Sequence, residues 1–311
     1  MIKTVKKIIS YIMVCVLFLS MCIPCEAAQT STATASDANA TTGFPQITST
    51  SAIIMDAQSG QIIYEKNSHT RQYPASITKI MTAYLAIKNG DLNSTITMSD
   101  AAVWGIDRNS SHIALDVGEE ISMSDALYAV MLMSANEAAW AIAEQVSGSL
   151  ENFVQLMNDT AQSLGCKDTH FTNANGLHDP DHYTTAYDMA LITKEALTSK
   201  TFREYASETY HEIPPTNMNN ETRYLTQGNR MMLSNSEYYY PACQGGKTGY
   251  TDDAGGTLVV WAFTHKRNCD NTTACGKLQA LFYNFTVEFV WKKYRSFSDT
   301  SFSSTLPSAS A

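Results

Sequence analysis

Residues 75–90, with the sequence ASITKIMTAYLAIKNG, form the segment around which we expect the rest of the chain to pack. Large apolar side chains recur in it at helical spacing and cover a wide face: Ile77, Ile80, Met81, Tyr84, Leu85 and Ile87. Pro74 precedes the segment and Asn89-Gly90 closes it, as is typical of helix boundaries. Because so wide an apolar face must be covered, the sequence predicts a buried helix.

The flanking segments predict strands at both ends of the chain and helices between them. Two apolar runs separated by DAQSG predict a β-hairpin over 51–64, and GGTLVVWAFT at 255–264 predicts a buried strand. Helical periodicity recurs at 122–144, as two helices or one broken helix, and again at 152–164 and 185–198. This order indicates an α+β fold, in which an antiparallel sheet built from both chain ends has helices packed on it.

The two termini differ in composition from this central part. Residues 1–27 combine a basic start, an apolar run and small residues before a cleavage point, which is typical of a secretory signal peptide; an uncleaved membrane anchor is the alternative. We expect residues 28–43 to be a flexible leader and residues 296–311 a disordered Ser-rich tail. One folded domain is therefore expected at 44–295, in a protein that works outside the cytoplasm.

Charge and cysteine content narrow the possible partners. The 311 residues include 21 Lys and Arg against 30 Asp and Glu, which gives a formal net charge of -9. Nucleic-acid binding needs clustered cations, so no nucleic-acid partner is expected. Cys269 and Cys275 could close a small disulfide loop in an exported protein, or could remain free, and the sequence leaves both possibilities open.

The first motif with chemical potential is Ser-Ile-Thr-Lys at 76–79, at the start of the predicted buried helix. A separation of three residues places the hydroxyl and the amine on one helix face, where Lys79 can be the base for a nucleophilic Ser76. Backbone N–H groups at the helix N-terminus can also stabilise a developing oxyanion. The plainer alternative is a helix cap, because Ser is common at that position.

Two further motifs place polar residues in apolar or Gly-rich surroundings. Ser-Ala-Asn at 134–136 interrupts an apolar helix, where polar groups are costly unless they are hydrogen-bonded or face a cavity; a satisfied helix junction is the alternative. Lys-Thr-Gly at 247–249 precedes the predicted buried strand and offers a cation and a hydroxyl to a carboxylate. Taken singly, each motif is weak evidence for a site.

Together, and in this order, the three motifs resemble those of the penicillin-binding protein and serine β-lactamase superfamily. More specifically, residues 51–263 resemble the D-alanyl-D-alanine carboxypeptidases of peptidase family S11, the low-molecular-mass penicillin-binding proteins. The similar segments are AIIMDAQSGQIIYEKN, PASITKIMTAYLA, FTNANGLHDPDHYTTAYDMA and GGKTGYTDDAGGTLV. The resemblance covers about two thirds of the chain and implies a β-lactamase/transpeptidase-like fold for the catalytic domain.

The resemblance implies a role for each motif residue. Ser76 is implied as the nucleophile that attacks between the two D-alanines of a peptidoglycan stem peptide, Lys79 as its base and Ser134 as a proton relay. The implied substrate-binding residues are Asn136, Lys247, Thr248, Gly249 and Tyr250. The backbone N–H groups of Ser76 and Tyr250 are expected to form the oxyanion hole. No cofactor and no metal are implied.

The same resemblance implies partners and leaves rival functions open. The expected substrate is a stem peptide ending in D-Ala-D-Ala, the expected inhibitors are β-lactams, and membrane contact is expected at most through an uncleaved signal segment. A class A β-lactamase shares the motifs but needs a Glu in a downstream loop, and residues 169–178 contain none. A D,D-endopeptidase and a non-catalytic cell-wall-binding descendant are two further rival functions.

Three stretches need comment against the family pattern. Ala135 replaces the Gly that is common in the second motif, and its small side chain is still compatible with activity. Residues 265–276 are polar where the family continues into another apolar strand, so we expect that strand to be missing. The His- and Asp-rich loop at 169–183 could ligate a metal, but in the resembled family it is non-metallic; structural roles are expected, with His182 and Asp188 in the family's H-x-x-x-A-x-D pattern.

Overall fold

The computed structural model describes residues 47–263 and 277–283, all of which lie within the compact unit Gly43–Ala311. The predicted signal peptide, leader and Ser-rich tail fall outside the described residues, as do Cys269 and Cys275. Within the described ranges, no helix combines the length and the apolar character that a membrane crossing requires.

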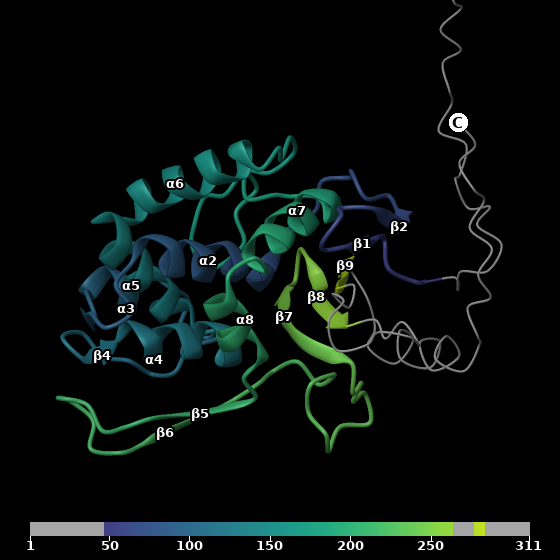
Figure 1. The fold of residues 1–311 in the computed structure, drawn as a ribbon. Helices are drawn as coiled ribbons and strands as arrows, with labels where there is room; N and C mark the ends of the chain where they lie inside the picture. Colours follow the sequence, from purple (N-terminus) through teal and green to yellow (C-terminus); the bar gives the residue numbers. More distant parts are fainter. Residues whose placement is uncertain (1–46, 264–276, 284–311) are drawn as a thin grey trace, which may run out of the picture. The chain divides into compact units, whose positions relative to one another are not determined.

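The elements follow one another along the described chain in an order that Figure 1 shows by colour. The strands are β1 (Ser51–Asp56), β2 (Ile62–Lys66), β3 (Thr95–Thr97), β4 (Glu120–Ser122), β5 (Tyr210–Ile213), β6 (Arg223–Thr226), β7 (Cys243–Thr251), β8 (Gly255–Phe263) and β9 (Lys277–Tyr283). The helices are η1 (Ala75–Thr78), α2 (Lys79–Asn89), α3 (Asp100–Trp104), α4 (Met123–Tyr128), η2 (Ala129–Met133), α5 (Asn136–Ser147), α6 (Leu150–Ser163), α7 (Ala186–Ala196) and α8 (Lys200–Ser207).

The main sheet has five antiparallel strands in the order β2-β1-β9-β8-β7. β1 and β2 come from the beginning of the folded chain, whereas β7, β8 and β9 come from its end (Figure 1). Helices α7 and α8 pack against this sheet, and α2 packs against α5, α6, α7 and α8. The predicted α+β fold, with an antiparallel sheet assembled from both chain ends, is confirmed.

The expectation that the sheet lacks a strand after Thr264 is wrong. β9 lies between β1 and β8, with Ala280 opposite both Ile54 and Val260. The strand is present, but the polar segment 264–276 separates it from β8 in sequence. The physical reason is that pairing depends on tertiary context: β9 supplies backbone hydrogen-bond partners to β1 on one side and to β8 on the other.

Apolar clusters on both faces of the sheet explain why the sequence of β8 is a continuous apolar run. Val259 and Trp261 join the main core with the helices, whereas Leu258 and Val260 face a second cluster on the opposite side of the sheet. Successive strand residues point to opposite faces, so both sets must be apolar when both faces are covered. The predicted buried helix is also confirmed, since Lys79 to Ala86 are all buried, although it begins as the 3-10 turn η1.

The helical region predicted at 122–144 is a broken helix. α4 runs into the π-helical turn η2, and the chain then leaves helical geometry at Ser134, which has the left-handed angles φ 60° and ψ 29°. α5 starts two residues later at Asn136. A left-handed non-Gly residue next to a π turn is strained, and such strain is concentrated at functional sites. The break places Ser134 and Ala135 between the two helical segments, directly before Asn136 at the start of α5.

Side-chain hydrogen bonds hold the His- and Asp-rich loop against η1 and α7. The Thr172 N–H donates to His182 Nδ1 at 3.0 Å, so the ring proton is on Nε2, which donates to Thr78 Oγ1 at 2.8 Å. Asp188 accepts from the Asp168 N–H and the Thr169 hydroxyl at 2.9 and 2.8 Å. Across the described part of the chain, no group of three or more His, Cys, Asp or Glu residues could hold a metal ion.

Several short elements were not predicted from the sequence. β3 pairs with β4, β5 pairs with β6, and α3 and α8 are helices of five and eight residues. Strands of three or four residues are too short to display an alternating pattern, and their pairing depends on segments distant in sequence.

Replacing Gly245 with alanine is expected to destabilise the protein, because a Cβ at this position of β7 would overlap the indole ring of Trp261 on β8. Overpacking costs about 1–3 kcal/mol, so the urea midpoint should fall. Gly228→Ala is the control, since the atom nearest to its Cβ, Leu132 O, is at an ordinary 3.6 Å. Equal midpoints for Gly245→Ala and wild type would contradict this packing.

His182 is expected to stay neutral in the folded protein under mildly acidic conditions. Burial lowers its pKa to about 3, although the negative charge of Asp179 opposes the shift; in an unfolded chain the pKa is about 6.5. The unfolded state therefore binds a proton first, and stability is lost as the pH falls below about 6.5. A ¹⁵N NMR titration of the imidazole, with urea-unfolded protein as reference, checks this; ionisation near pH 6 in the folded state would refute it.

Candidate active site

Ser76 is held in place by segments on two sides of η1. Ala75, directly before it, has the positive φ of 50°, and Gly176, with φ 83°, packs so closely on the Ala75 carbonyl that a Cβ would overlap it. On the other side, the Thr257 hydroxyl of β8 donates to Pro74 O at 2.9 Å. Strained backbone persists only where its surroundings determine it, so the position of the Ser76 hydroxyl is tightly constrained.

Lys79 directs a fully buried amine at three oxygen atoms. Its Nζ lies 3.1 Å from Ser76 Oγ, 2.6 Å from Asn136 Oδ1 and 2.5 Å from the backbone oxygen of Asn175. The residue has 0% exposure, although it carries an ionisable group. The first turn of α2, the first residue of α5 and the turn at 173–177 therefore meet at one nitrogen atom.

The surroundings favour the neutral form of this amine. Burial, and then the positive charge of Lys247, lower the pKa of Lys79 well below its ordinary value, and the negative charge of Glu137 opposes them only partly. A neutral amine has two N–H groups and one lone pair. Asn136 Oδ1 and the Asn175 carbonyl can only accept, so they take the two N–H groups and leave the lone pair for the Ser76 hydroxyl proton. The arrangement can deprotonate Ser76.

A second buried lysine faces Ser134. Lys247 Nζ donates to Ser134 Oγ at 3.0 Å and to the Thr248 carbonyl at 2.8 Å. Lys247 is 2% exposed, and burial lowers its pKa to about 7. The left-handed geometry of Ser134 is what presents its hydroxyl to this amine. The pair can hold an anionic group and move a proton close to it.

β7 brings the third motif against the first. A Cβ on Gly249 would lie 2.7 Å from Ser76 N and would also collide with the Thr257 hydroxyl, so only glycine allows the strand to run this close to η1. Tyr250 lies on the same strand, but its side chain is 69% exposed and its hydroxyl donates to Asp252. The Tyr250 hydroxyl is therefore directed to Asp252 rather than to a motif residue, and the backbone of Tyr250 is the part that lies in β7 beside Gly249.

The structure brings together most of the residues singled out in the sequence, and adds others. Ser76, Lys79 and Asn136 form one hydrogen-bonded group, and Lys247 with Ser134 forms a second. Sequence reasoning missed the Asn175 carbonyl, because no motif marks a backbone oxygen. It also missed Ser110, whose hydroxyl accepts from Asn136 Nδ2 at 2.7 Å; the polar run DRNSSH at 107–112 was the available signal.

Comparison with known proteins places the chain in a family. The family model described as D-alanyl-D-alanine carboxypeptidase, peptidase family S11, matches residues 36–272. D-alanyl-D-alanine carboxypeptidase DacF of Bacillus subtilis is 37% identical over 66% of this chain and 51% of its own length. DacA of Haemophilus influenzae is 36% identical over 71% of this chain and 55% of its own length. The chain thus spans about half the length of these curated relatives.

Solved structures support the same assignment at the level of the fold. A single-residue variant of a Streptomyces DD-transpeptidase superposes with a TM-score of 0.71 at 24% identity, over 82% of this chain and 98% of the other. A D-alanyl-D-alanine carboxypeptidase from Mycobacterium tuberculosis gives a TM-score of 0.69 at 24% identity, over 84% and 95%. With its three motifs gathered around one serine and a family model that covers most of its length, this chain belongs to the D-alanyl-D-alanine carboxypeptidase family, peptidase family S11.

Proposed function

We propose that this protein is a serine-type D-Ala-D-Ala carboxypeptidase that removes the terminal D-alanine of peptidoglycan stem peptides through an acyl-enzyme on Ser76. The observation that carries the proposal is the buried Lys79 amine, 3.1 Å from the Ser76 hydroxyl and held by two oxygens that can only accept. The family to which the chain belongs supports the same reaction. A non-catalytic descendant is disfavoured, because a wall-binding role alone gives no reason to bury this amine.

In the acylation step, Lys79 Nζ takes the Ser76 hydroxyl proton while Oγ attacks the carbonyl carbon of the penultimate D-alanine. The N–H groups of Ser76 and Tyr250 receive the negative charge that develops on the carbonyl oxygen; one such donor is typically worth about 2.7–4 kcal/mol. The C–N bond then breaks, Ser134 gives its proton to the leaving amine of D-alanine, and the proton held by Lys79 passes to Ser134, which leaves Lys79 neutral again. An ester to Ser76 remains.

Substrate recognition is assigned to the second lysine and its strand. Lys247 and Thr248 bind the carboxylate of the terminal D-alanine, next to Gly249, where the strand backbone passes closest to Ser76. Asn136 contacts the substrate peptide through the groups that remain, one lone pair of Oδ1 and one hydrogen of Nδ2, because Oδ1 already accepts from Lys79 and Nδ2 already donates to Ser110.

Deacylation uses the same base on water. Lys79 takes a proton from a water molecule, the hydroxide attacks the ester carbonyl, and Ser76 leaves with a proton returned by the amine. A β-lactam that acylates Ser76 keeps its leaving group attached and is expected to be released slowly. We further propose that the protein acts outside the cytoplasm, where peptidoglycan lies, after export by the segment 1–27.

The wild type is expected to release D-alanine from diacetyl-Lys-D-Ala-D-Ala and to form a long-lived adduct with fluorescent penicillin. Ser76→Ala should lose both activities, since no other group replaces the nucleophile; mass spectrometry of the labelled peptide locates the adduct. Rapid turnover of penicillin would favour a β-lactamase, cleavage of cross-linked dimers would favour a D,D-endopeptidase, and no labelling of folded wild type would favour the wall-binding role.

The KM for this peptide is expected to rise as the pH increases past about 7. Burial lowers the pKa of Lys247 to about 7, and only the protonated amine attracts a carboxylate. Lys247→Ala should raise KM at about pH 6 by tenfold or more, as expected for a charged hydrogen bond worth about 1.5–3 kcal/mol. Lys200→Ala, which removes the exposed Lys200–Glu204 pair, is the control. A wild-type KM that stays flat between about pH 6 and 9 would exclude this role.

A further inference from the structure

The segment Asp107–Asp116 contacts the active site through Asn136. Asn136 Nδ2 donates to Ser110 Oγ at 2.7 Å, and the Asn136 backbone N–H donates to Ser111 O at 2.9 Å. The other side of the same carboxamide, Oδ1, accepts from Lys79. The orientation of the amide that holds Lys79 therefore depends on where this segment lies.

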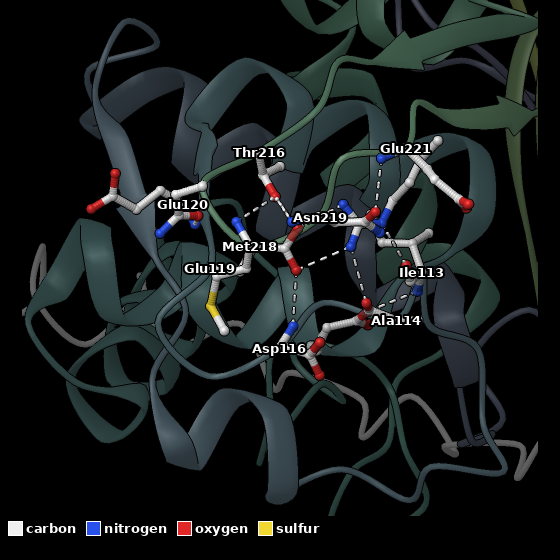
Figure 2. A network of polar contacts seen from close by, with 12 residues as sticks. Ile113, Ala114, Asp116, Glu119, Glu120, Thr216, Met218, Asn219 and Glu221 are labelled. Atoms are coloured by element: carbon white, nitrogen blue, oxygen red, sulfur yellow. Dashed lines mark hydrogen bonds and ion pairs between the residues drawn. The ribbon is translucent and has the colours of Figure 1, made fainter.

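The segment has no regular secondary structure of its own, and it is held by side chains on both sides. From the core side, Glu137 Oε1 accepts from the Ile113 N–H at 2.7 Å. From the outer side, Arg223 of β6 donates to the carbonyls of Ile113 and Ala114, both at 3.1 Å (Figure 2). Ala114 has the strained φ of 57°, so the local backbone does not adopt this shape by preference.

Arg223 is in turn fixed by Glu119, which lies just before β4. Its two terminal nitrogens donate to the two oxygens of Glu119 at 2.7 and 3.0 Å. The Thr216 hydroxyl and the Asp116 N–H donate to the same carboxylate, as Figure 2 shows. The Glu119 side chain is fully buried and that of Arg223 is only 11% exposed. A bidentate ion pair of this kind fixes the relative orientation of its two side chains as well as the distance between them.

The charge state of the pair is stable at working pH. Burial of Glu119 opposes its ionisation, but hydrogen bonds from Arg223, Thr216 and the Asp116 N–H, together with the charge of Arg223, outweigh burial and lower its pKa. The interaction is therefore fully present above the pH range in which a carboxylic acid ordinarily ionises, and it is lost as the pH falls through the lowered pKa of Glu119.

We propose that the buried Glu119–Arg223 pair is a positioning device for the reaction: it fixes the segment Asp107–Asp116 and, through Ser110 and Ser111, sets Asn136 against Lys79. The side-chain hydrogen bonds of the pair run to this segment and to Thr216, so both residues act through the segment rather than on substrate. The expected effect on the reaction rate rests on the proposed function. The expected effect on the order of the segment Asp107–Asp116 does not depend on it.

The test compares Arg223→Gln and Arg223→Lys with wild type at a temperature well below unfolding. We measure acylation by fluorescent penicillin, kcat and KM for the diacetyl peptide, and amide hydrogen exchange at Ile113 and Asn136. Because small misplacements of reacting groups are costly, Arg223→Gln should slow acylation and kcat by about 10-fold to 100-fold, with KM changed much less. Arg223→Lys should show a smaller loss of rate, since lysine keeps the positive charge but cannot donate two parallel hydrogen bonds to the carboxylate.

Controls separate positioning from stability. Arg71→Gln removes an exposed ion pair with Asp168 and should leave rate and exchange unchanged. Arg223→Gln should also exchange the Ile113 and Asn136 amides faster than wild type; Glu119→Gln replaces it if that variant does not fold, and should show the same effect. Wild-type rates and protection in a folded Arg223→Gln or Glu119→Gln variant would overturn the inference, as would a lowered unfolding midpoint with unchanged rate.

The exchange measurement distinguishes failure of this inference from failure of the proposed function. If wild type neither binds penicillin nor releases D-alanine, the proposed function is lost, but faster exchange at Asn136 in the variants still supports positioning. If wild type is active and the variants match it in rate and exchange, the function stands and the positioning role is rejected.

Discussion

The burial of the Lys79 amine is the constraint on which the rest of the site depends. A charged ammonium in so dry an environment costs several kcal/mol, and the neutral amine still needs partners for its N–H groups. Asn136 Oδ1 and the Asn175 carbonyl meet that need, and this requirement brings the start of α5 and the turn at 173–177 to the same point. The environment that makes the charged lysine costly to bury also favours its neutral form.

Strained backbone lies at or next to both serines of the site. Ala75 and Ser134 both have positive φ angles, and the π turn η2 directly precedes Ser134. Elsewhere the helices follow ordinary rules, with Ser or Thr caps on α3, α4, α6, α7 and α8. The regular part of the fold thus stabilises a small irregular region, and that region presents the hydroxyls of Ser76 and Ser134 to their lysines.

Periodicity identified the elements that are long or strongly apolar, such as the helix after Pro74 and β8. It failed where the information is not local. β9 was missed because it follows the polar segment 264–276, and its place is determined by the strands β1 and β8 on either side of it. The pairs β3–β4 and β5–β6 were missed because strands of three or four residues are too short to show an alternation of apolar and polar residues.

The sequence by itself determined the fold class and pointed to the candidate site residues, because the residue types and the order of the three motifs are typical of one family. Only the tertiary structure decided how these side chains are arranged: the oxygen atoms beside the Lys79 amine, the exposure of the Tyr250 side chain, and the pair of Glu119 with Arg223, far apart in the chain. Proton affinity and orientation depend on burial and distance, and both arise only when separate segments pack.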